Sequence, residues 1–380
     1  MLFNKVILFV DVPFTKRDYK RFGINIFKNN NISVFIWDFG LLTNKNKYYS
    51  YDSDPGFKCD ELIVFKTIKE SKNSLKSLNS KDVVIIHIPF SIQTYYIFNL
   101  LHKLKVYYGP TSPGLVPIPP RVLNKKKIFK YLINPINTFK LLLQKVFINF
   151  FKTKNRFLII SGYISKPLKV NSSLDLIFSH QLDYDIFLNK KSSLKSKNNY
   201  AVFLDEYAPF HPDAAEEPVC EPENYYDDLN YFFDRIEDKL KLKIIIAAHP
   251  RSDYINSKYF NDRKILKSKT SSLIKNSSLV LTHASTANNF SVIFKKPILF
   301  ITSSKYSNYF QSTINSFANE FNKTSIDISK NYEIDPSIYN IDSSAYEHYM
   351  NRFIKTKHSK DLNSWQIFIN HLNNFFTTNE

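Results

Sequence analysis

The stretch Thr282-His-Ala-Ser-Thr-Ala-Asn-Asn-Phe-Ser-Val-Ile-Phe-Lys-Lys-Pro-Ile-Leu-Phe-Ile301 decides the fold of this chain. It follows an apolar run at 279–281, passes through small hydroxyl residues into a helical pattern, and ends in a second apolar run. That order predicts a strand, a loop large enough for a phosphate, a helix and a strand. Ser285 and Thr286 then lie at the start of the helix, where free backbone N–H groups favour an anion.

A second strand end offers a similar group. Ile244-Ile-Ile-Ala-Ala-His-Pro250 is a β-branched run that stops at a His-Pro pair. An imidazole there can hydrogen-bond a phosphate or protonate a leaving group, and the following arginine can add a charge-assisted contact. The predicted phosphate-binding residues of the two strand ends are His249, Pro250, Arg251, His283, Ser285 and Thr286.

Each of these residues also has a structural interpretation. His249 can be an ordinary packed histidine, and His283 either contacts a ligand or only packs. Arg251 can form a surface salt bridge. Ser285 and Thr286 can cap the helix, although a cap that leaves one N–H free still attracts phosphate.

Two carboxylates follow the first strand of the second half, in Phe203-Leu-Asp-Glu-Tyr-Ala-Pro-Phe-His-Pro-Asp213. Open α/β sheets bind their ligands at the carboxyl ends of strands, which is where Asp205 and Glu206 fall. A carboxylate there can act as a base on a sugar hydroxyl or attack an anomeric carbon. We predict catalytic roles for Asp205, Glu206 and His249. The alternative for the two carboxylates is a solvated acidic turn or a helix N-cap.

Length and composition limit the class of protein. A chain of 380 residues predicts two domains, and two cysteines argue against a disulfide framework or a cysteine-based zinc site. No run reaches the roughly 18 apolar residues of a membrane span, and Val6–Val10 is too short for a signal peptide. We expect a cytoplasmic protein, with the inner face of the cell membrane as a peripheral location.

The net charge of +18 is unevenly distributed. From Val83 to Leu174 there is no Asp or Glu but there are 14 Lys or Arg, nine of them between Lys125 and Arg156, whereas Asp205–Asp238 holds 12 acidic residues. In the basic stretch, phenylalanines and leucines recur near helical spacing between lysines. Such a helix either lies on an anionic membrane or packs its apolar stripe on the core.

The rest of the chain predicts an α/β fold with two Rossmann-like domains. Short β-branched runs alternate with helical patterns in both halves, which is typical of doubly wound parallel sheets. The predicted strands are 6–10, 32–37, 62–65, 83–88, 157–160, 174–179, 200–204, 243–247, 279–282 and 297–301; the predicted helices are 17–28, 94–103, 225–240, 286–294 and 344–376. The predicted domains are 1–188 and 200–340, joined by a Lys/Ser/Asn-rich linker at 189–199, with C-terminal helices at 341–380 packing back toward the first domain.

The sequence contains few motifs of the kind that bind metals or nucleotides. Asp52-Ser-Asp54 is an Asp-x-Asp pair of the kind that can bind a divalent ion, but it lies in an evident turn. No Walker A loop, GxGxxG fingerprint or Gly-x-Ser-x-Gly elbow occurs. We therefore predict no metal and no cofactor.

The motifs at 200–302 resemble those of GT-B glycosyltransferases that use CMP-activated sugars, and the segment 203–213 is most similar to the retaining β-Kdo transferases of bacterial surface-polysaccharide synthesis. The resemblance implies two Rossmann-like domains facing across a cleft that holds CMP. It implies that His249, Ser285 and Thr286 bind the CMP phosphate and that Asp205 is the nucleophile, or the base if configuration inverts. A retaining site of this kind implies an acidic partner from the first domain, and Val83–Leu174 supplies none, so the partner must come from elsewhere, for instance Asp11 or Glu206.

The resemblance also implies a nucleotide-sugar donor, a glycan or glycolipid acceptor and no nucleic acid. UDP-sugar sites of this architecture often carry a glutamate for the ribose, where this chain has Ala287-Asn-Asn-Phe-Ser. Two alternatives remain: an enzyme similar to the non-hydrolysing nucleotide-sugar epimerases, and a non-catalytic protein that binds polyanions or membranes.

Overall fold

The first lobe is built on a parallel sheet whose strand order is β3-β2-β1-β4-β5. A pair of parallel strands extends it, because Thr111 bridges to Ile159 and the Arg156 N–H donates to the Tyr108 carbonyl at 2.8 Å. The strands are β1 (Lys5–Val10), β2 (Ser33–Asp38), β3 (Leu62–Val64), β4 (Asp82–His87), β5 (Tyr107–Pro110), β6 (Phe157–Ile160) and β7 (Asp175–Phe178).

The helices of this lobe differ from the prediction at one informative place. The pattern at 17–28 forms two helices, because Gly23 between them has φ +62° and its position is closed to a side chain by Trp365. The helices are α1 (Lys16–Arg21), α2 (Ile24–Asn29), α3 (Gly40–Thr43), α4 (Lys45–Ser50), α5 (Ile68–Lys76), α6 (Tyr95–Lys103) and α8 (Pro135–Phe150). Helix α9 (Leu182–Asn189) follows β7 and packs Tyr184 and Phe187 against the apolar core of the second lobe.

The second lobe repeats the design with a sheet of order β10-β9-β8-β11-β12-β13. Its strands are β8 (Tyr200–Leu204), β9 (Lys243–Ala248), β10 (Lys264–Lys267), β11 (Leu279–Thr282), β12 (Ile298–Thr302) and β13 (Ile326–Asp327). Its helices are α10 (Pro222–Leu240), α11 (Thr270–Asn276), α12 (Asn288–Ile293), α13 (Asn308–Asn319) and α14 (Ser343–Tyr349), followed by a π-helical turn at Met350–Ile354.

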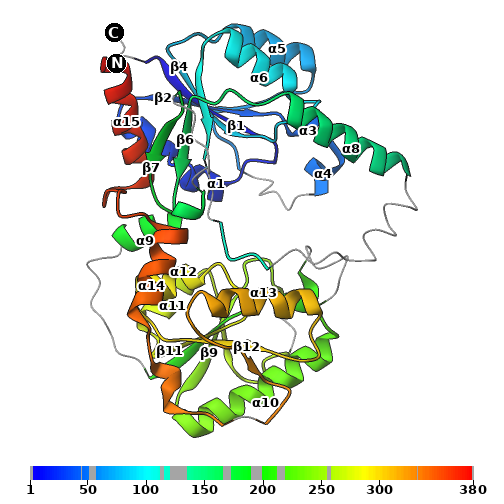
Figure 1. Ribbon diagram of the computed structural model, residues 1–380, viewed down its shortest axis with the longest axis vertical. Coiled ribbons are helices and arrows are strands. Elements are labelled where there is room, and N and C mark those ends of the chain that lie inside the picture. The colour runs from blue at the N-terminus through cyan, green and yellow to red at the C-terminus, as the bar shows by residue number, and fades with distance from the viewer. Residues whose placement is uncertain are drawn as a thin grey trace.

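The computed structural model describes residues 3–43, 45–50, 57–111, 115–119, 135–165, 173–189, 199–211, 219–254, 258–331 and 333–378. Within them the two lobes have separate apolar cores, and the lobes lie one above the other in Figure 1. Two parallel sheets, each covered by helices (Figure 1), confirm the predicted α/β fold with two Rossmann-like lobes. The predicted linker, apart from Asn189 and Asn199, and the Asp52-Ser-Asp54 pair lie outside the described residues.

The C-terminal region is divided between the lobes. Tyr346 and Tyr349 of α14 are buried in the second core, whereas α15 (Ser364–Thr378) places Phe368 and Leu372 in the first. The single helical pattern at 344–376 is therefore two helices, joined by the π-helical turn and by a segment of turns and bends at 355–363 that crosses from one lobe to the other (Figure 1).

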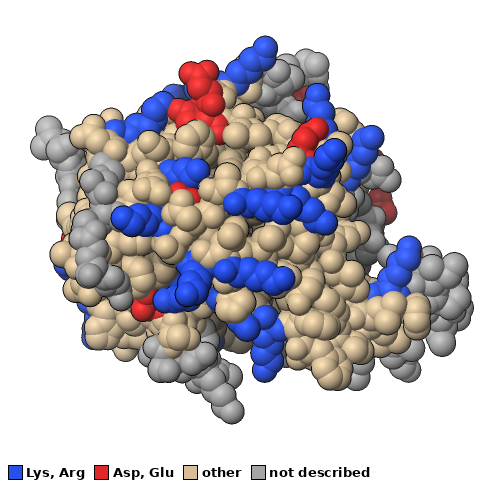
Figure 2. Space-filling model, turned by 90° about the horizontal axis from the view of Figure 1, so that it is seen from above, with Lys and Arg blue, Asp and Glu red and all other residues tan. Residues whose placement is uncertain are grey.

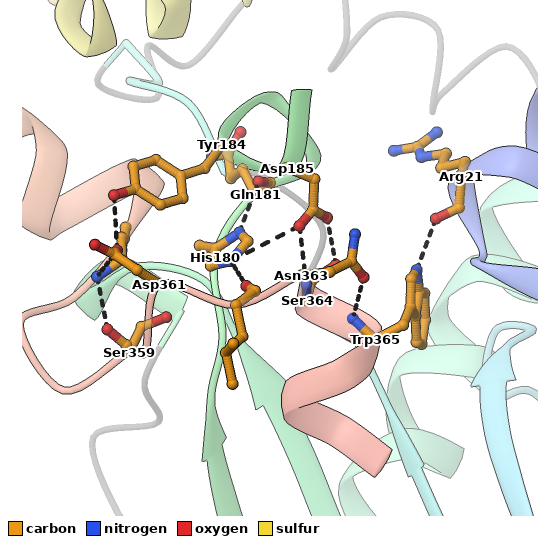
Figure 3. Close-up of polar contacts among 12 residues, drawn as sticks. Arg21, His180, Gln181, Tyr184, Asp185, Ser359, Asp361, Asn363, Ser364 and Trp365 are labelled. Atoms are coloured by element: carbon orange, nitrogen blue, oxygen red, sulfur yellow. Dashed lines mark hydrogen bonds and ion pairs between the residues drawn. The ribbon is translucent and has the colours of Figure 1, made fainter. Parts of the chain in front are cut away.

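Polar contacts hold this crossing in place (Figure 3). The Asp185 carboxylate accepts the N–H and the hydroxyl of Ser364 at 2.9 and 2.5 Å, and a ring nitrogen of His180 lies 3.8 Å from it. The Trp365 indole donates to the Arg21 carbonyl at 2.8 Å. From the second lobe, the Asn289 amide donates to the side chain of Gln181 at 2.7 Å.

Candidate functional site

The candidate site lies where the second sheet reverses its direction of growth. From β8 the chain builds β9 and β10 on one side, then returns to place β11 on the other side of β8. Open α/β sheets bind ligands at the carboxyl edge of such a switch point. Asp205 and Glu206 follow β8 at this edge, His249 follows β9, and Ser285 lies in the turn after β11.

The Asp205 carboxylate joins the ends of β8 and β9. One of its oxygens accepts the Tyr207 N–H at 2.9 Å; the other accepts the His249 N–H at 3.2 Å and the Tyr254 hydroxyl at 2.9 Å. Asp205 is only 4% exposed, and burial raises its pKa while the three donors oppose that effect. Each carboxylate oxygen can accept two hydrogen bonds, so the oxygen bonded to Tyr207 retains a lone pair among the described contacts.

The turn after Asp205 is strained. Tyr207 has φ +54°, a left-handed conformation that is uncommon for a bulky residue, and its ring contacts Tyr254 edge-on at 5.5 Å. Strain of this kind persists only where surrounding contacts impose it, and it is frequent at ligand-binding sites.

Glu206 joins the end of β8 to the turn after β11. Its Oε1 accepts the Ala284 N–H at 2.6 Å, directly across the switch point. Burial raises its pKa to about 8; the Ala284 N–H lowers it, and the charge of Asp205 adds a smaller upward contribution. Glu206 is therefore a neutral acid at pH 7, with a proton to give.

His249 presents one nitrogen as a donor. Its Nδ1 accepts the Arg251 N–H at 3.2 Å, which leaves the proton on Nε2. Burial is the largest cause that lowers the pKa of His249 to about 4; His211, whose ring centroid lies 5.1 Å away, and the positive charges of Arg251, Lys267 and Arg17 contribute to the same shift. Neutral His249 can thus donate an Nε2–H to an anion without itself being charged.

The surrounding cations come from both lobes. Arg251 and Lys267 belong to the second lobe, and Arg17 lies on α1 of the first. None of the three forms a salt bridge with an acidic group in the described part of the chain. Unneutralised positive charge around a hydrogen-bond donor favours a phosphate or a carboxylate.

The turn after β11 adds two backbone donors. Among the described contacts, the N–H groups of Ser285 and Thr286 have no acceptor, whereas Ser285 Oγ accepts the Ala287 N–H at 3.3 Å. Helix α12 begins only at Asn288 and has six residues. The anion preference expected at this helix start therefore depends on two free N–H groups rather than on a long helix dipole.

The remaining predicted residues have structural positions. Of the two roles considered for His283, the structure shows packing: the residue is fully buried, its Nδ1 lies 2.7 Å from the Ile301 carbonyl, and its Nε2 lies 3.0 Å from the Tyr225 hydroxyl. The prediction that His283 binds phosphate is therefore corrected, because the side chain is buried and both ring nitrogens already have partners. Pro250 is exposed in the turn that ends β9.

The first lobe has its own switch-point residues. Asp11 follows β1 and is half-buried; it contributes to raising the pKa of Asp38, which burial brings to about 6. His87, the last residue of β4, lies 3.1 Å from the Thr111 hydroxyl, and burial, with a contribution from Arg21, lowers its pKa to about 4. Asp11 and Arg21 are thus at the first lobe's ligand edge, but no described contact joins them to Asp205 or His249.

Arg17, Lys267 and Tyr254 were not predicted from the sequence. The capping box Thr15-Lys-Arg-Asp18 marks the start of α1, but nothing local says that this helix approaches β9. Tyr254 and Lys267 belong to segments without a motif, and only packing brings them to the site.

No protein-family model matches this chain, and no curated protein matches it. Its fold is similar to that of solved structures. A UDP complex of S. aureus MnaA has TM-score 0.47 and 12% identity over 98% of this chain and 97% of that one. A putative UDP-N-acetylglucosamine 2-epimerase from Listeria monocytogenes has TM-score 0.49 and 10% identity over 98% and 96%. Acinetobacter baumannii MurG has TM-score 0.45 and 8% identity over 97% and 99%. The similarity concerns the fold alone.

Proposed function

We propose that this chain is a metal-independent glycosyltransferase that moves a 2-keto acid sugar, Kdo or a related one, from a CMP donor to a bacterial surface glycan or glycolipid. The observation that carries the proposal is the positive charge of Arg17, Arg251 and Lys267, which acts on His249 and forms no salt bridge in the described part of the chain. His249 offers an Nε2–H at the same sheet edge as Glu206, whose pKa burial raises to about 8. A CMP-linked keto acid sugar brings one phosphate and one carboxylate. This set of donors matches both charges without a divalent ion.

In the binding step, the residues of the site hold the phosphate and the carboxylate of the donor. His249 and the free N–H groups of Ser285 and Thr286 hold the phosphate, and Arg251, Lys267 and Arg17 supply the charge. Because Arg17 comes from the first lobe, binding of the anion draws the two lobes together. The stretch 287–291 offers no carboxylate for a ribose, and Asn289 is engaged with Gln181, which supports a donor other than a UDP-sugar.

The transfer step uses the two adjacent carboxyl groups. Asp205 attacks the anomeric carbon with its less engaged oxygen as the carbon–phosphate oxygen bond breaks, and Glu206 gives its proton to the departing phosphate. In the second half-reaction the ionised Glu206 takes a proton from the acceptor hydroxyl as that oxygen displaces Asp205, so configuration is retained. Since Asp205 is 4% exposed, the Tyr207 turn must shift before it reacts.

Donor turnover tests the proposal. The protein is incubated separately with CMP-Kdo, CMP-sialic acid and UDP-N-acetylglucosamine, and nucleotide release and sugar products are measured with and without an acceptor glycan. Release of CMP from a keto acid sugar supports the proposal. Conversion of the UDP-sugar to its C2 epimer would establish the epimerase alternative. If no donor is turned over, the result would favour the alternative of a non-catalytic binding protein.

A substitution locates the activity at this site. His249→Ala removes the phosphate donor, so the KM for the donor rises and kcat falls, because the bond strengthens as charge develops on the departing CMP. The matched control is His348→Ala, an exposed histidine on α14. Titration calorimetry with CMP gives the second readout. If the variant binds CMP with unchanged affinity and has an unchanged rate, His249 has only a structural role.

A further inference from the structure

Helix α8 leaves most of its apolar side chains in solvent. Only Gln144 and Phe147 are half-buried among its last ten residues. The Gln144 side chain bonds to the backbone of Phe90 and Ile92, and the Phe147 ring lies 5.5 Å from that of Phe90. The exposed apolar residues on and just after the helix are Phe139 (62%), Leu141 (50%), Leu142 (55%), Leu143 (45%), Val146 (51%), Ile148 (44%), Phe150 (80%) and Phe151 (46%).

Most of these side chains belong to one stripe. Phe139, Leu142, Leu143, Val146 and Phe150 follow one another at intervals of three, one, three and four residues, which places them along a single face of an α-helix. That face is not the one that carries Gln144 and Phe147. The helix therefore packs on the lobe with one edge and exposes a separate apolar face about 17 Å long, from Phe139 to Phe150.

The charges around the stripe are all positive. Lys140 and Lys145 are exposed on α8, and Lys152 and Lys154 follow it. No acidic residue occurs between Val83 and Leu174, so nothing in that part of the sequence neutralises them. Among the charged residues on the face seen in Figure 2, Lys and Arg cover more of the surface than Asp and Glu.

We propose that α8 is an in-plane anchor that docks the first lobe on an anionic lipid bilayer. An apolar stripe bordered by lysines suits the headgroup boundary, where the rings and aliphatic side chains enter the acyl region and the lysines reach the phosphates. No helix in the described ranges is long and apolar enough to cross a membrane. The docking does not depend on the transfer chemistry, and it would bring the enzyme to a lipid-linked acceptor.

Vesicle flotation tests the anchor. Wild-type protein is mixed at low and high salt with phosphatidylcholine vesicles that contain or lack phosphatidylglycerol. We expect flotation with the anionic vesicles at low salt and weaker flotation at high salt. Leu142→Glu/Val146→Glu should abolish binding, and Lys140→Gln/Lys145→Gln should reduce partitioning about thirtyfold at low salt.

Matched variants on the second lobe serve as controls. Tyr231→Glu/Tyr309→Glu introduces the same charges at exposed aromatic positions (57% and 63%), and Lys258→Gln/Lys264→Gln removes two exposed lysines. Both should float like wild type. Thermal melts should be unchanged for the α8 variants, since their side chains contact solvent; if the glutamate variant unfolds, the lysine variant alone decides.

Three outcomes would overturn the anchor. In the first, wild-type protein does not bind anionic vesicles at low salt, and in the second, the α8 variants float like wild type. In the third, wild-type protein is a dimer, and the glutamate variant becomes monomeric but still floats. The last, seen by light scattering, would assign the stripe to a second copy of the chain. None of these results bears on donor turnover, so failure of the anchor and failure of the proposed transferase activity are separable.

Discussion

Replacing Glu206 by glutamine should make the protein more stable and less active. Burial raises the pKa of Glu206 to about 8 from 4.5, so the folded protein keeps a proton that the unfolded chain releases over that range. Unfolding therefore releases a proton between pH 4.5 and 8, and wild-type stability falls as the pH rises through this window. Below pH 4.5 both states are protonated and the effect vanishes.

The size of the effect follows from the same shift. A difference of about 3.5 pH units corresponds to about 5 kcal/mol, and partial access of water to this half-buried group brings the expectation to about 3–5 kcal/mol above pH 8. Glutamine has the shape of the protonated acid and keeps the oxygen that accepts the Ala284 N–H. The free energy of unfolding of Glu206→Gln should therefore equal that of wild type near pH 4.5 and exceed it increasingly up to pH 8.

Urea unfolding of both proteins at about pH 5 and about pH 8.5 measures this difference. The control is Glu333→Gln, an exposed carboxylate of the same lobe, which should track wild type at both pH values. Donor turnover is measured on the same samples and should fall by orders of magnitude, because glutamine has no proton to give. A stability difference that does not change with pH would refute the raised pKa, and full activity of the variant would refute the proton-donor role.

Three further substitutions test other parts of the structure. Asp205→Asn should abolish transfer while CMP affinity, measured by calorimetry, stays nearly intact; near-normal turnover in a folded variant would remove Asp205 from the chemistry. Gly23→Ala should cost about 2–4 kcal/mol in urea unfolding, because the glycine has φ +62° and a Cβ there would lie 2.3 Å from the Trp365 ring; a loss below about 0.5 kcal/mol would show that this contact yields easily. Asn289→Ala should cost about 1–3 kcal/mol by leaving the half-buried Asp183 carboxylate, 2.9 Å away, without its amide donor; unchanged unfolding would show that other contacts hold the lobes together.

Much of the fold was accessible from the sequence, because hydrophobic periodicity is a local property. Strands β1, β2, β4, β8, β9, β11 and β12 lie within a residue or two of the predicted runs, since each is a short β-branched segment bounded by polar or breaking residues. The errors fall where a tertiary contact decides. Gly23 divides the predicted helix because Trp365, far along the chain, occupies the space beside it, and the C-terminal pattern divides because its two parts are buried in different lobes.

The same distinction applies to the site. By itself the sequence determined which residues stand at strand ends: Asp205, Glu206, His249 and the Ser285-Thr286 pair all follow apolar runs, and parallel strands bring their carboxyl ends to one edge. Only the tertiary structure decided what each group can do there. In the folded protein the His283 side chain packs in the core, and Glu206 accepts a hydrogen bond from Ala284 in a position where burial raises its pKa. Arg17 of the other lobe lies where its charge acts on His249. Burial and charge depend on neighbours distant in sequence, and these neighbours are fixed only when the two sheets and the crossing C-terminal segment have packed together.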